Sequence, residues 1–448
     1  MLRAPSQRPN HYFKRKSEMK LLKVSVAGLF ALISSASFSA DLATLQSLPL
    51  LTMDKWEYVG GFRIPADTYG ESNITYSEGP IAMGAGGKSI YIVSHTYQQA
   101  IGEFSVPALV NSLKVSDFQY AGVVQNFSRV LGRPQSGNPQ NMDRIGGMAY
   151  VNGQLLVNTY IYYDGGNVGT NTTLVVKNAA NLAGSGVAGY HSYSARAHAA
   201  GWLSRIPSDW QSELGGTYIA GSSSGQPIIS RWSVGPSAFV FDPEKTNYSS
   251  LGPSAVPMTK LLDYSLDNVM GVGTQTIESY LNNSTLKNSL WDHLSRATYG
   301  FVVPGTRTYM TVGFNGGMTS GVGYKITQDD GNLCGGYCAY KAADYSNYYW
   351  LFDMNDLLKV KAGQMNSYDV KPYAYGKLDR TTYANTGFNP IIGAAFDEST
   401  NRLYLSLERG DVLPYSGWAP SIVAFKLNVN VPSPPLPPTN PSATVIGQ

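Results

Sequence analysis

One structural unit recurs along this sequence and limits what the chain can fold into. Its clearest copy is Asn389–Leu427, where a small apolar stretch at 391–396 is followed by a polar Asp-Glu-Ser-Thr-Asn turn. Residues 402–407 and 421–427 then alternate between the two faces of an extended chain. Alternation bounded by polar turn residues is typical of β-strands, so this stretch predicts a three-strand meander.

Four further copies of this unit begin near residues 79, 145, 235 and 297. The spacing between copies is uneven, about 60 to 95 residues, which indicates long loop insertions. Repeated meanders that cannot bury their own faces predict an all-β fold, a β-propeller, whose closed ring removes exposed sheet edges. The gaps at Gly186–Arg231 and Leu251–Ser295 each leave room for one more copy, so we expect five to seven blades. A pair of β-sandwiches is the alternative fold.

The ring is expected to close between the two ends of the propeller. Trp56–Ile64 is consistent with a bulged strand that completes the final blade, which gives a propeller domain over residues 56–428. Residues 41–55 are expected to form a tether before this domain, and residues 429–448 a Pro-rich linker after it. Short helices are predicted at Ser208–Leu214, Thr274–Leu281 and Leu357–Ala362.

The composition agrees with an all-β fold rich in turns. Charged residues make up 14% of the 448 residues, well below the usual value of about 25%. The chain contains 47 glycines and 31 tyrosines. Few charges, many glycines and many tyrosines are typical of a secreted all-β protein and disfavour a helical cytosolic enzyme.

Residues 1–40 have the three parts of a signal peptide. A short basic segment at Met19–Lys23 precedes the apolar Val24–Ile33, and small residues follow at Ser34–Ala40. We therefore expect cleavage and a secreted or periplasmic protein, with residues 1–18 as an over-long start and Met19 as the more natural initiator. A single membrane anchor is the alternative, but the apolar run is short for a bilayer span. No other stretch is long enough, so no span is expected after cleavage.

Most of the positive charge lies in this signal segment. Residues 1–40 hold seven of the 33 basic residues and one of the 30 acidic residues. The rest of the chain has 26 basic and 29 acidic residues, a net charge near −3. A chain with this charge lacks the basic footprint of a nucleic-acid-binding protein, so no nucleic-acid partner is expected.

The two cysteines, Cys334 and Cys338, lie in one short Leu-Cys-Gly-Gly-Tyr-Cys segment. In an oxidising compartment this spacing favours a small local disulfide. The alternative, a zinc site, needs two more ligands, and the neighbouring sequence offers no Cys or His. No cofactor is predicted, and a structural divalent cation is left open.

Several blade segments together resemble a known group of proteins. These segments are Gly146–Tyr150, Pro236–Pro243, Gly393–Asp397 and Arg402–Ser406. In combination they resemble secreted bacterial β-propeller proteins of unassigned function, and the resemblance covers most of Trp56–Leu427. It implies the propeller fold and supplies no catalytic residues, because propellers host many unrelated functions.

Motifs that would identify an enzyme class directly are scarce. The sequence has no H-E-x-x-H, phosphate-binding loop or EF-hand calcium loop. Gly221–Gly225 matches G-x-S-x-G in letters only, because it lies in a Gly/Ser loop and not between a strand and a helix. The Arg-Gly-Asp at residues 409–411 is expected to be a solvated turn and not an adhesion signal.

The densest aromatic site is Tyr160–Asp164, which directly follows a predicted blade strand. Exposed tyrosines beside Asn, Asp and Arg are the usual chemistry of sugar recognition, because rings stack on the apolar sugar face and polar groups bind hydroxyls. The alternative is that these tyrosines pack in the core or between blades. The candidate ligand-binding residues are Tyr160, Tyr162, Tyr163, Asp164, Asp143, Arg144, Tyr190 and Arg205.

Two classes of function follow from these residues. In the first, a non-catalytic propeller binds an extracellular polysaccharide or a cell-surface protein through its loop face. The scarcity of catalytic motifs and the linker-like tail favour this class. Its binding residues are expected in the insertions around Tyr160–Asp164, Tyr190–Arg205 and Gly316–Ser346, because these are the parts that the blades do not share.

In the second class, the protein is a polysaccharide-degrading enzyme. A lyase needs Tyr or His as base and acid and Arg or a cation to neutralise a uronate, with the candidates His95, Tyr160, Tyr162, His191 and Arg144. A hydrolase, the less favoured reading, needs two carboxylates about 5–10 Å apart, with the candidates Glu78, Asp143, Asp164 and Glu408. His, Tyr and Arg meeting at one funnel support a lyase, whereas a funnel lined by Gly and apolar side chains excludes both enzymes.

Overall fold

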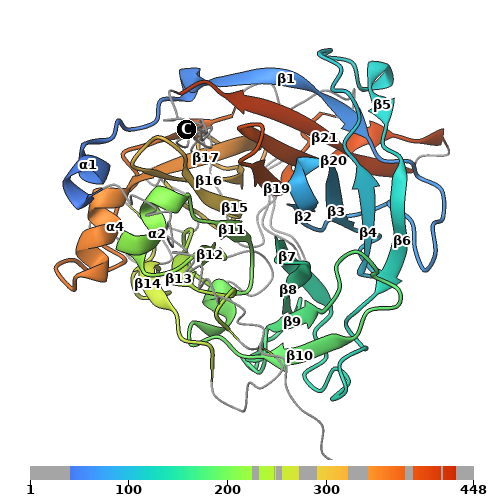
Figure 1. Cartoon of the computed structure of the whole chain (residues 1–448). Coiled ribbons are helices and arrows are strands. Elements are labelled where there is room, and N and C mark those ends of the chain that lie inside the picture. Colours follow the sequence, from blue (N-terminus) through green and yellow to red (C-terminus); the bar gives the residue numbers. More distant parts are fainter. Residues whose placement is uncertain are drawn as a thin grey trace, which may run out of the picture. The chain divides into compact units, whose positions relative to one another are not determined.

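The computed structural model describes residues 41–223, 232–246, 248, 255–271, 290–320, 342–378, 387–414 and 417–429. These residues form five sheets, four of four strands and one of five, arranged as the blades of a β-propeller (Figure 1). The prediction of an all-β propeller is confirmed, and the number of blades is five. The predicted signal peptide, the Thr274–Leu281 helix, Cys334, Cys338 and the Pro-rich linker beyond residue 429 lie outside the described residues.

The first two blades follow the predicted units closely. Blade 1 contains β2 (Ile81–Met83), β3 (Ser89–Val93), β4 (Ala100–Ser105) and β6 (Val123–Arg129). Blade 2 contains β7 (Arg144–Val151), β8 (Gln154–Tyr160), β9 (Thr173–Val176) and β10 (Val187–His191). Neighbouring strands in both sheets are antiparallel, as a meander requires.

Blade 3 corrects one sequence prediction. It contains β11 (Leu203–Arg205), β12 (Tyr218–Ala220), β13 (Ala238–Phe241) and β14 (Thr259–Leu262). The stretch beginning at Gly235 was expected to open a blade, but it leads into the third strand of this one. The true first two strands have three residues each, which is too short to show alternation. They lie in the gap that had been expected to hold an additional blade.

Blades 4 and 5 complete the ring. Blade 4 contains β15 (Arg296–Val303), β16 (Thr308–Asn315), β17 (Ser346–Asp353) and β18 (Ala374–Lys377). Blade 5 contains β19 (Ile391–Asp397), β20 (Arg402–Val412) and β21 (Trp418–Leu427), followed by the N-terminal β1 (Trp56–Arg63) and β5 (Gln119–Tyr120). The antiparallel pairing of β1 with β21, with a bulge between Tyr58 and Gly60, confirms the predicted closure.

The innermost strands β2, β7, β11, β15 and β19 surround a narrow central channel, and each contacts the innermost strand of the next blade. Glycines allow this close approach. A Cβ atom on Gly146 would lie 2.3 Å from the Ala200 carbonyl oxygen, and one on Gly147 would lie 2.1 Å from that of Gly201. Both distances are shorter than any van der Waals contact, so the small residues in the first strand of each unit are a requirement of ring closure.

Short helices lie in the segments outside the strands. The predicted α2 (Ser208–Leu214) is present and ends at Gly215, whose φ of 78° is left-handed. Helix α4 (Met354–Lys361) starts three residues before its predicted position, because the Asp353 carboxylate caps the Asn355 N–H at 2.9 Å. The other helical segments among the described residues are α1 (Leu42–Ser47) and the 3₁₀ turns η1 (Met53–Lys55), η2 (Ala85–Gly87), η3 (Val115–Asp117) and η4 (Arg196–Ala199).

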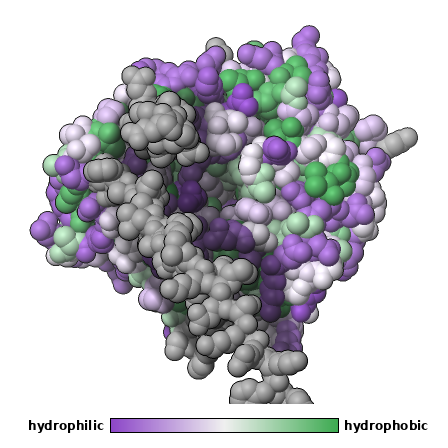
Figure 2. All heavy atoms as spheres, in the orientation of Figure 1, coloured by the Kyte–Doolittle hydropathy of each residue, from purple (hydrophilic) through white to green (hydrophobic). Residues whose placement is uncertain are grey.

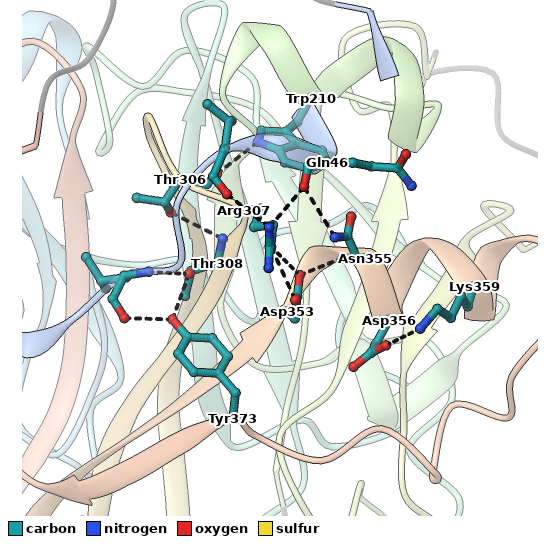
Figure 3. A network of polar contacts seen from close by, with 12 residues as sticks. Gln46, Trp210, Thr306, Arg307, Thr308, Asp353, Asn355, Asp356, Lys359 and Tyr373 are labelled. Carbon is teal, nitrogen blue, oxygen red and sulfur yellow. Dashed lines mark hydrogen bonds and ion pairs between the residues drawn. The ribbon is translucent and has the colours of Figure 1, made fainter. Parts of the chain in front are cut away.

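The segment expected to be a tether packs against blade 4. Leu45 and Leu51 are each only 1% exposed. Figure 3 shows Arg307, which donates from Nη1 to the Gln46 carbonyl oxygen at 3.0 Å and forms an ion pair with Asp353 at 3.2 Å. Residues 41–55 are therefore folded onto the propeller.

One face of the described part is largely hydrophilic. Figure 2 shows polar residues dominating one face, with hydrophobic patches separated by polar ones. None of the helices in the described part of the chain has the length and apolarity that crossing a bilayer requires.

Candidate functional site

The central channel opens at two mouths with different chemistry. The innermost strands run in the same direction, so their first residues gather at one end, the N-mouth, and their last residues at the other, the C-mouth. The N-mouth holds a slot of about 50 Å³, and small residues such as Pro80, Gly146 and Ala200 form part of its lining. Its polar and aromatic lining comes from Glu78, Tyr160, Trp202, Ser222, Ser223, Trp232, Arg296 and Thr298.

Two aromatic rings flank the slot. Tyr160 is the last residue of β8 and lies opposite Arg144 in the blade 2 ladder. Its ring meets that of Trp232 at 5.3 Å between centroids and at 90°, an edge-to-face contact. Tyr160, a candidate from the sequence, thus lies at this slot, and Trp232 is a neighbour that the sequence did not indicate.

Glu78 and Arg296 place opposite charges on the same slot. Glu78 is exposed in the loop before β2, and Arg296 is the half-buried first residue of β15. Within the described part of the chain, neither side chain has an ion-pair partner within 4 Å. Both charges are therefore available to a ligand, one as a hydrogen-bond acceptor and one as a donor.

Glu408 lies within electrostatic range of both of these charges. Burial raises the pKa of Glu408, Arg409 opposes this effect, and the negative charge of Glu78 raises the pKa further. Arg409 donates from Nε to Glu408 Oε1 at 3.0 Å. Of the four predicted hydrolase carboxylates, the structure thus brings Glu78 and Glu408 into one region.

A run of aromatic rings extends over the loops of blades 5 and 1. Trp418 meets Tyr76 at 5.3 Å, Tyr76 meets His95 at 5.6 Å, and His95 meets Tyr97 at 5.4 Å between ring centroids. We call these four residues the aromatic run. The Arg409 guanidinium lies 5.7 Å from the Trp418 ring, which links the run to Glu408. Tyr97 is 81% exposed, so the run ends in solvent.

His95 occupies a defined position in this run. Its Nδ1 accepts the Tyr97 N–H at 3.2 Å, so the proton of the neutral ring is on Nε2. Burial lowers the pKa of His95, and Glu78 partly offsets this effect. The predicted candidate His95 therefore lies near Glu78, although it does not line the slot itself.

A second group lies at the start of blade 2. Tyr162 donates its backbone N–H to Asp143 Oδ1 at 2.7 Å, and the Arg144 guanidinium lies 5.0 Å from the Tyr162 ring. Arg144 also forms an ion pair with Asp143 at 3.7 Å. Tyr162 and Tyr163 are 45% and 60% exposed, so these two tyrosines are the solvent-exposed part of the predicted Tyr160–Asp164 site.

Four predicted candidates do not belong to the N-mouth. The Asp164 carboxylate is buried and accepts the backbone N–H groups of Val168 and Gly169, so it supports its own loop. Tyr190 and His191 lie on β10, the outermost strand of blade 2, where Tyr190 donates to the Leu131 carbonyl oxygen at 2.8 Å. Arg205 ends β11 and lines the C-mouth. The sequence also offers Arg231, beside Arg144 and Arg205, as an arginine that could hold a ligand carboxylate, and this residue lies outside the described residues.

The G-x-S-x-G letters and the Arg-Gly-Asp have structural roles. Ser223 Oγ donates to the Ala297 carbonyl oxygen and accepts the Ala297 N–H, both at 2.9 Å, so this hydroxyl joins blade 3 to blade 4. Asp411 is 5% exposed within β20 and lies 3.8 Å from Arg63. The expectation of a solvated Arg-Gly-Asp turn is wrong, because this tripeptide forms an irregularity inside a strand.

The described residues contain no group of three or more His, Cys, Asp or Glu side chains positioned to hold a metal ion. No known protein-family profile matches the chain, and no curated protein is significantly similar to it in sequence. The fold alone therefore defines the class, a five-bladed β-propeller with a polar and aromatic N-mouth. The resemblance to secreted bacterial propellers stays a prediction.

Proposed function

We propose that this protein is an exported β-propeller that binds an extracellular glycan across its N-mouth. The observation that carries the proposal is the meeting of Glu78 and Arg296, both unpaired within the described residues, with the Tyr160–Trp232 ring pair at one slot. Sugars are recognised by this combination, because charged groups bind hydroxyls strongly and rings cover the apolar sugar face.

The size of the slot decides how such a ligand lies. A cavity of about 150 Å³ accommodates a six-membered ring such as benzene, so a slot of about 50 Å³ admits one substituent and not a whole sugar ring. A glycan therefore lies over the mouth and inserts one substituent, a hydroxymethyl or a carboxylate, toward Arg296. Further rings of the chain are then positioned to stack on the aromatic run, which supports an oligosaccharide ligand over a monosaccharide.

A direct test is binding of the chain from residue 41 to an array of acidic and neutral polysaccharides. Trp418→Ala and Tyr160→Ala are expected to weaken binding of any glycan that the protein retains by about fivefold or more, since a stacked ring contributes about 1–2 kcal/mol. Tyr120→Ala removes an exposed ring of blade 5 that is not part of the N-mouth and serves as the matched control. Absence of glycan binding, or equal losses in all three variants, contradicts the proposal, and capture of a protein partner alone favours the protein-binding form.

A second candidate function is polysaccharide cleavage, and one observation favours it. Glu78 and Glu408 are two carboxylates in one region, and the raised pKa of Glu408 beside the exposed Glu78 is the arrangement that separates an acid from a base. The lyase form is supported by Tyr160 and Arg296 at one slot, but no histidine lines that slot in the described structure. New reducing ends that disappear in Glu408→Gln support a hydrolase, whereas unsaturated products followed by ultraviolet absorbance support a lyase.

A further inference from the structure

The C-mouth holds the larger cavity of the two ends of the channel. Its volume is about 250 Å³, against about 50 Å³ at the N-mouth. A cavity of about 150 Å³ accommodates a six-membered ring such as benzene, so about 250 Å³ leaves room for one small ring with its hydroxyls. Three glycines of the blade 1 turn, Gly84, Gly86 and Gly87, line it and keep the space free of side chains.

An ion pair spans the C-mouth between blades that are not neighbours. Arg205 ends the innermost strand of blade 3, and Glu398 follows the innermost strand of blade 5. Arg205 Nη1 lies 3.4 Å from Glu398 Oε2, and the two side chains are 46% and 38% exposed. Burial raises the pKa of Glu398 and Arg205 opposes this effect. The pair therefore offers both donors and acceptors at the cavity while contributing no net charge.

The C-mouth is also lined by aromatic rings and by one buried hydroxyl that has no hydrogen-bond partner among the described residues. Phe301 and Phe396 stack at 4.9 Å between centroids with only 20° between their planes, and Tyr299 and Tyr218 lie beside them in the lining. Ser204, which also lines the cavity, is 3% exposed, and its hydroxyl has no hydrogen-bond partner among the described residues. A buried hydroxyl without a partner costs free energy, which a hydroxyl-bearing ligand can recover after a small rearrangement.

From these features we infer that the C-mouth is a second binding site, for a single neutral sugar ring or a polyol of that size. The aromatic walls suit the apolar face of such a ring, and Arg205, Glu398 and Ser204 suit its hydroxyls. The ligand is neutral because Arg205 and Glu398 already neutralise each other, so an added charge would have to displace one member of the pair. This site is separate from the N-mouth, and its occupancy does not depend on the proposed glycan function.

The test is a titration of the full chain from residue 41 with glucose, galactose, mannose and xylose, followed by ligand-observed NMR and calorimetry. We expect at least one of them to bind saturably with millimolar or tighter affinity. Arg205→Ala is expected to weaken that binding about tenfold or more, because a hydrogen bond to a charged group is lost. Ser204→Leu is expected to abolish it by filling the cavity.

Two controls separate this site from the N-mouth and from general damage. Tyr160→Ala alters the N-mouth and is expected to leave monosaccharide affinity unchanged, and Lys359→Ala removes an exposed ion pair in α4 with the same expectation. A cooperative thermal unfolding transition of Arg205→Ala, at a melting temperature near that of the parent chain, shows that this variant folds. The inference is overturned if none of the four sugars saturates, or if binding is lost in Tyr160→Ala and kept in Arg205→Ala and Ser204→Leu. Loss of polysaccharide binding with intact monosaccharide binding counts against the proposed function only.

Discussion

At the residue scale, Arg296 is the side chain on which the chemistry of the N-mouth depends most. It lines the slot and lacks an ion-pair partner among the described residues, so its charge is available to a ligand carboxylate. We predict that Arg296→Gln weakens binding of polygalacturonate about tenfold or more, because a charge-assisted hydrogen bond contributes about 1.5–3 kcal/mol. Calorimetry of the variant against the parent chain measures this. Arg129→Gln, on the outer strand of blade 1, should bind as the parent does, and an equal loss in both variants contradicts a specific role.

Asp292 sets a pH dependence of stability at the same scale. Burial raises its pKa to about 8, because the residue is fully buried just before β15. The folded protein therefore keeps a proton that the unfolded chain releases near pH 4, so this residue's contribution to stability falls as the pH rises from about 4 to about 8. Above about pH 8 both states are ionised and the dependence ends.

Asp292→Asn is predicted to remove this dependence. The melting temperature of the variant, relative to that of the parent, should rise from pH 5 to pH 8, since the amide keeps the shape of the carboxyl and cannot ionise. Thermal unfolding at both pH values measures the difference. A gap between variant and parent that is constant with pH would show that Asp292 does not titrate as described.

At the element scale, the close packing of the innermost strands predicts that replacing Gly146 lowers the stability of the fold. Gly146→Ala places a methyl group 2.3 Å from the Ala200 carbonyl oxygen, so blades 2 and 3 must move apart. We expect a loss of about 1–3 kcal/mol in unfolding free energy, measured by chemical denaturation. Gly132→Ala is the matched control, because no atom lies within 4 Å of its added Cβ. Equal stability of the two variants contradicts this account of the channel.

The N-terminal segment gives a second prediction for an element. Arg307 joins residues 41–55 to blade 4 through the Gln46 and Leu48 carbonyl oxygens and through Asp353 (Figure 3). Arg307→Ala is expected to release this segment locally, with cleavage near residues 41–50 in limited proteolysis while the blades stay intact. Lys359→Ala, which removes an exposed ion pair of α4, should show no such cleavage. Unchanged protection in Arg307→Ala would show that Leu45 and Leu51 hold the segment without it.

The alternation of apolar residues was enough to predict most strands, and most of the strands that it did not predict are short. Long alternating strands such as β8 and β20 were predictable because their apolar face is visible over six or more residues. The three-residue strands β11 and β12 were not, since so short a strand has no period. Tyr160 was a candidate from the sequence, because it lies at the end of an alternating stretch. Arg296 and Trp232 were not, because only ring closure brings them beside it.

At the scale of the whole molecule, the two mouths divide the candidate residues. Ring closure brings the starts of the five innermost strands together at the N-mouth. Arg205, predicted alongside Arg144, lies at the opposite end of the channel. Sequence neighbours such as Ser204 and Trp202 therefore line different mouths. In the proposed account, ligand binding therefore depends on the ends of several blades together and not on any one blade.

The most direct test of the central claim is calorimetric titration of the chain from residue 41 with a polysaccharide selected on the array, in parallel with Trp418→Ala, Arg296→Gln and the control Tyr120→Ala. We predict saturable binding by the parent chain and by Tyr120→Ala, and a loss of about fivefold or more in the other two variants. Saturable binding that is equal in all four proteins, or no binding by the parent chain, would contradict glycan recognition at the N-mouth.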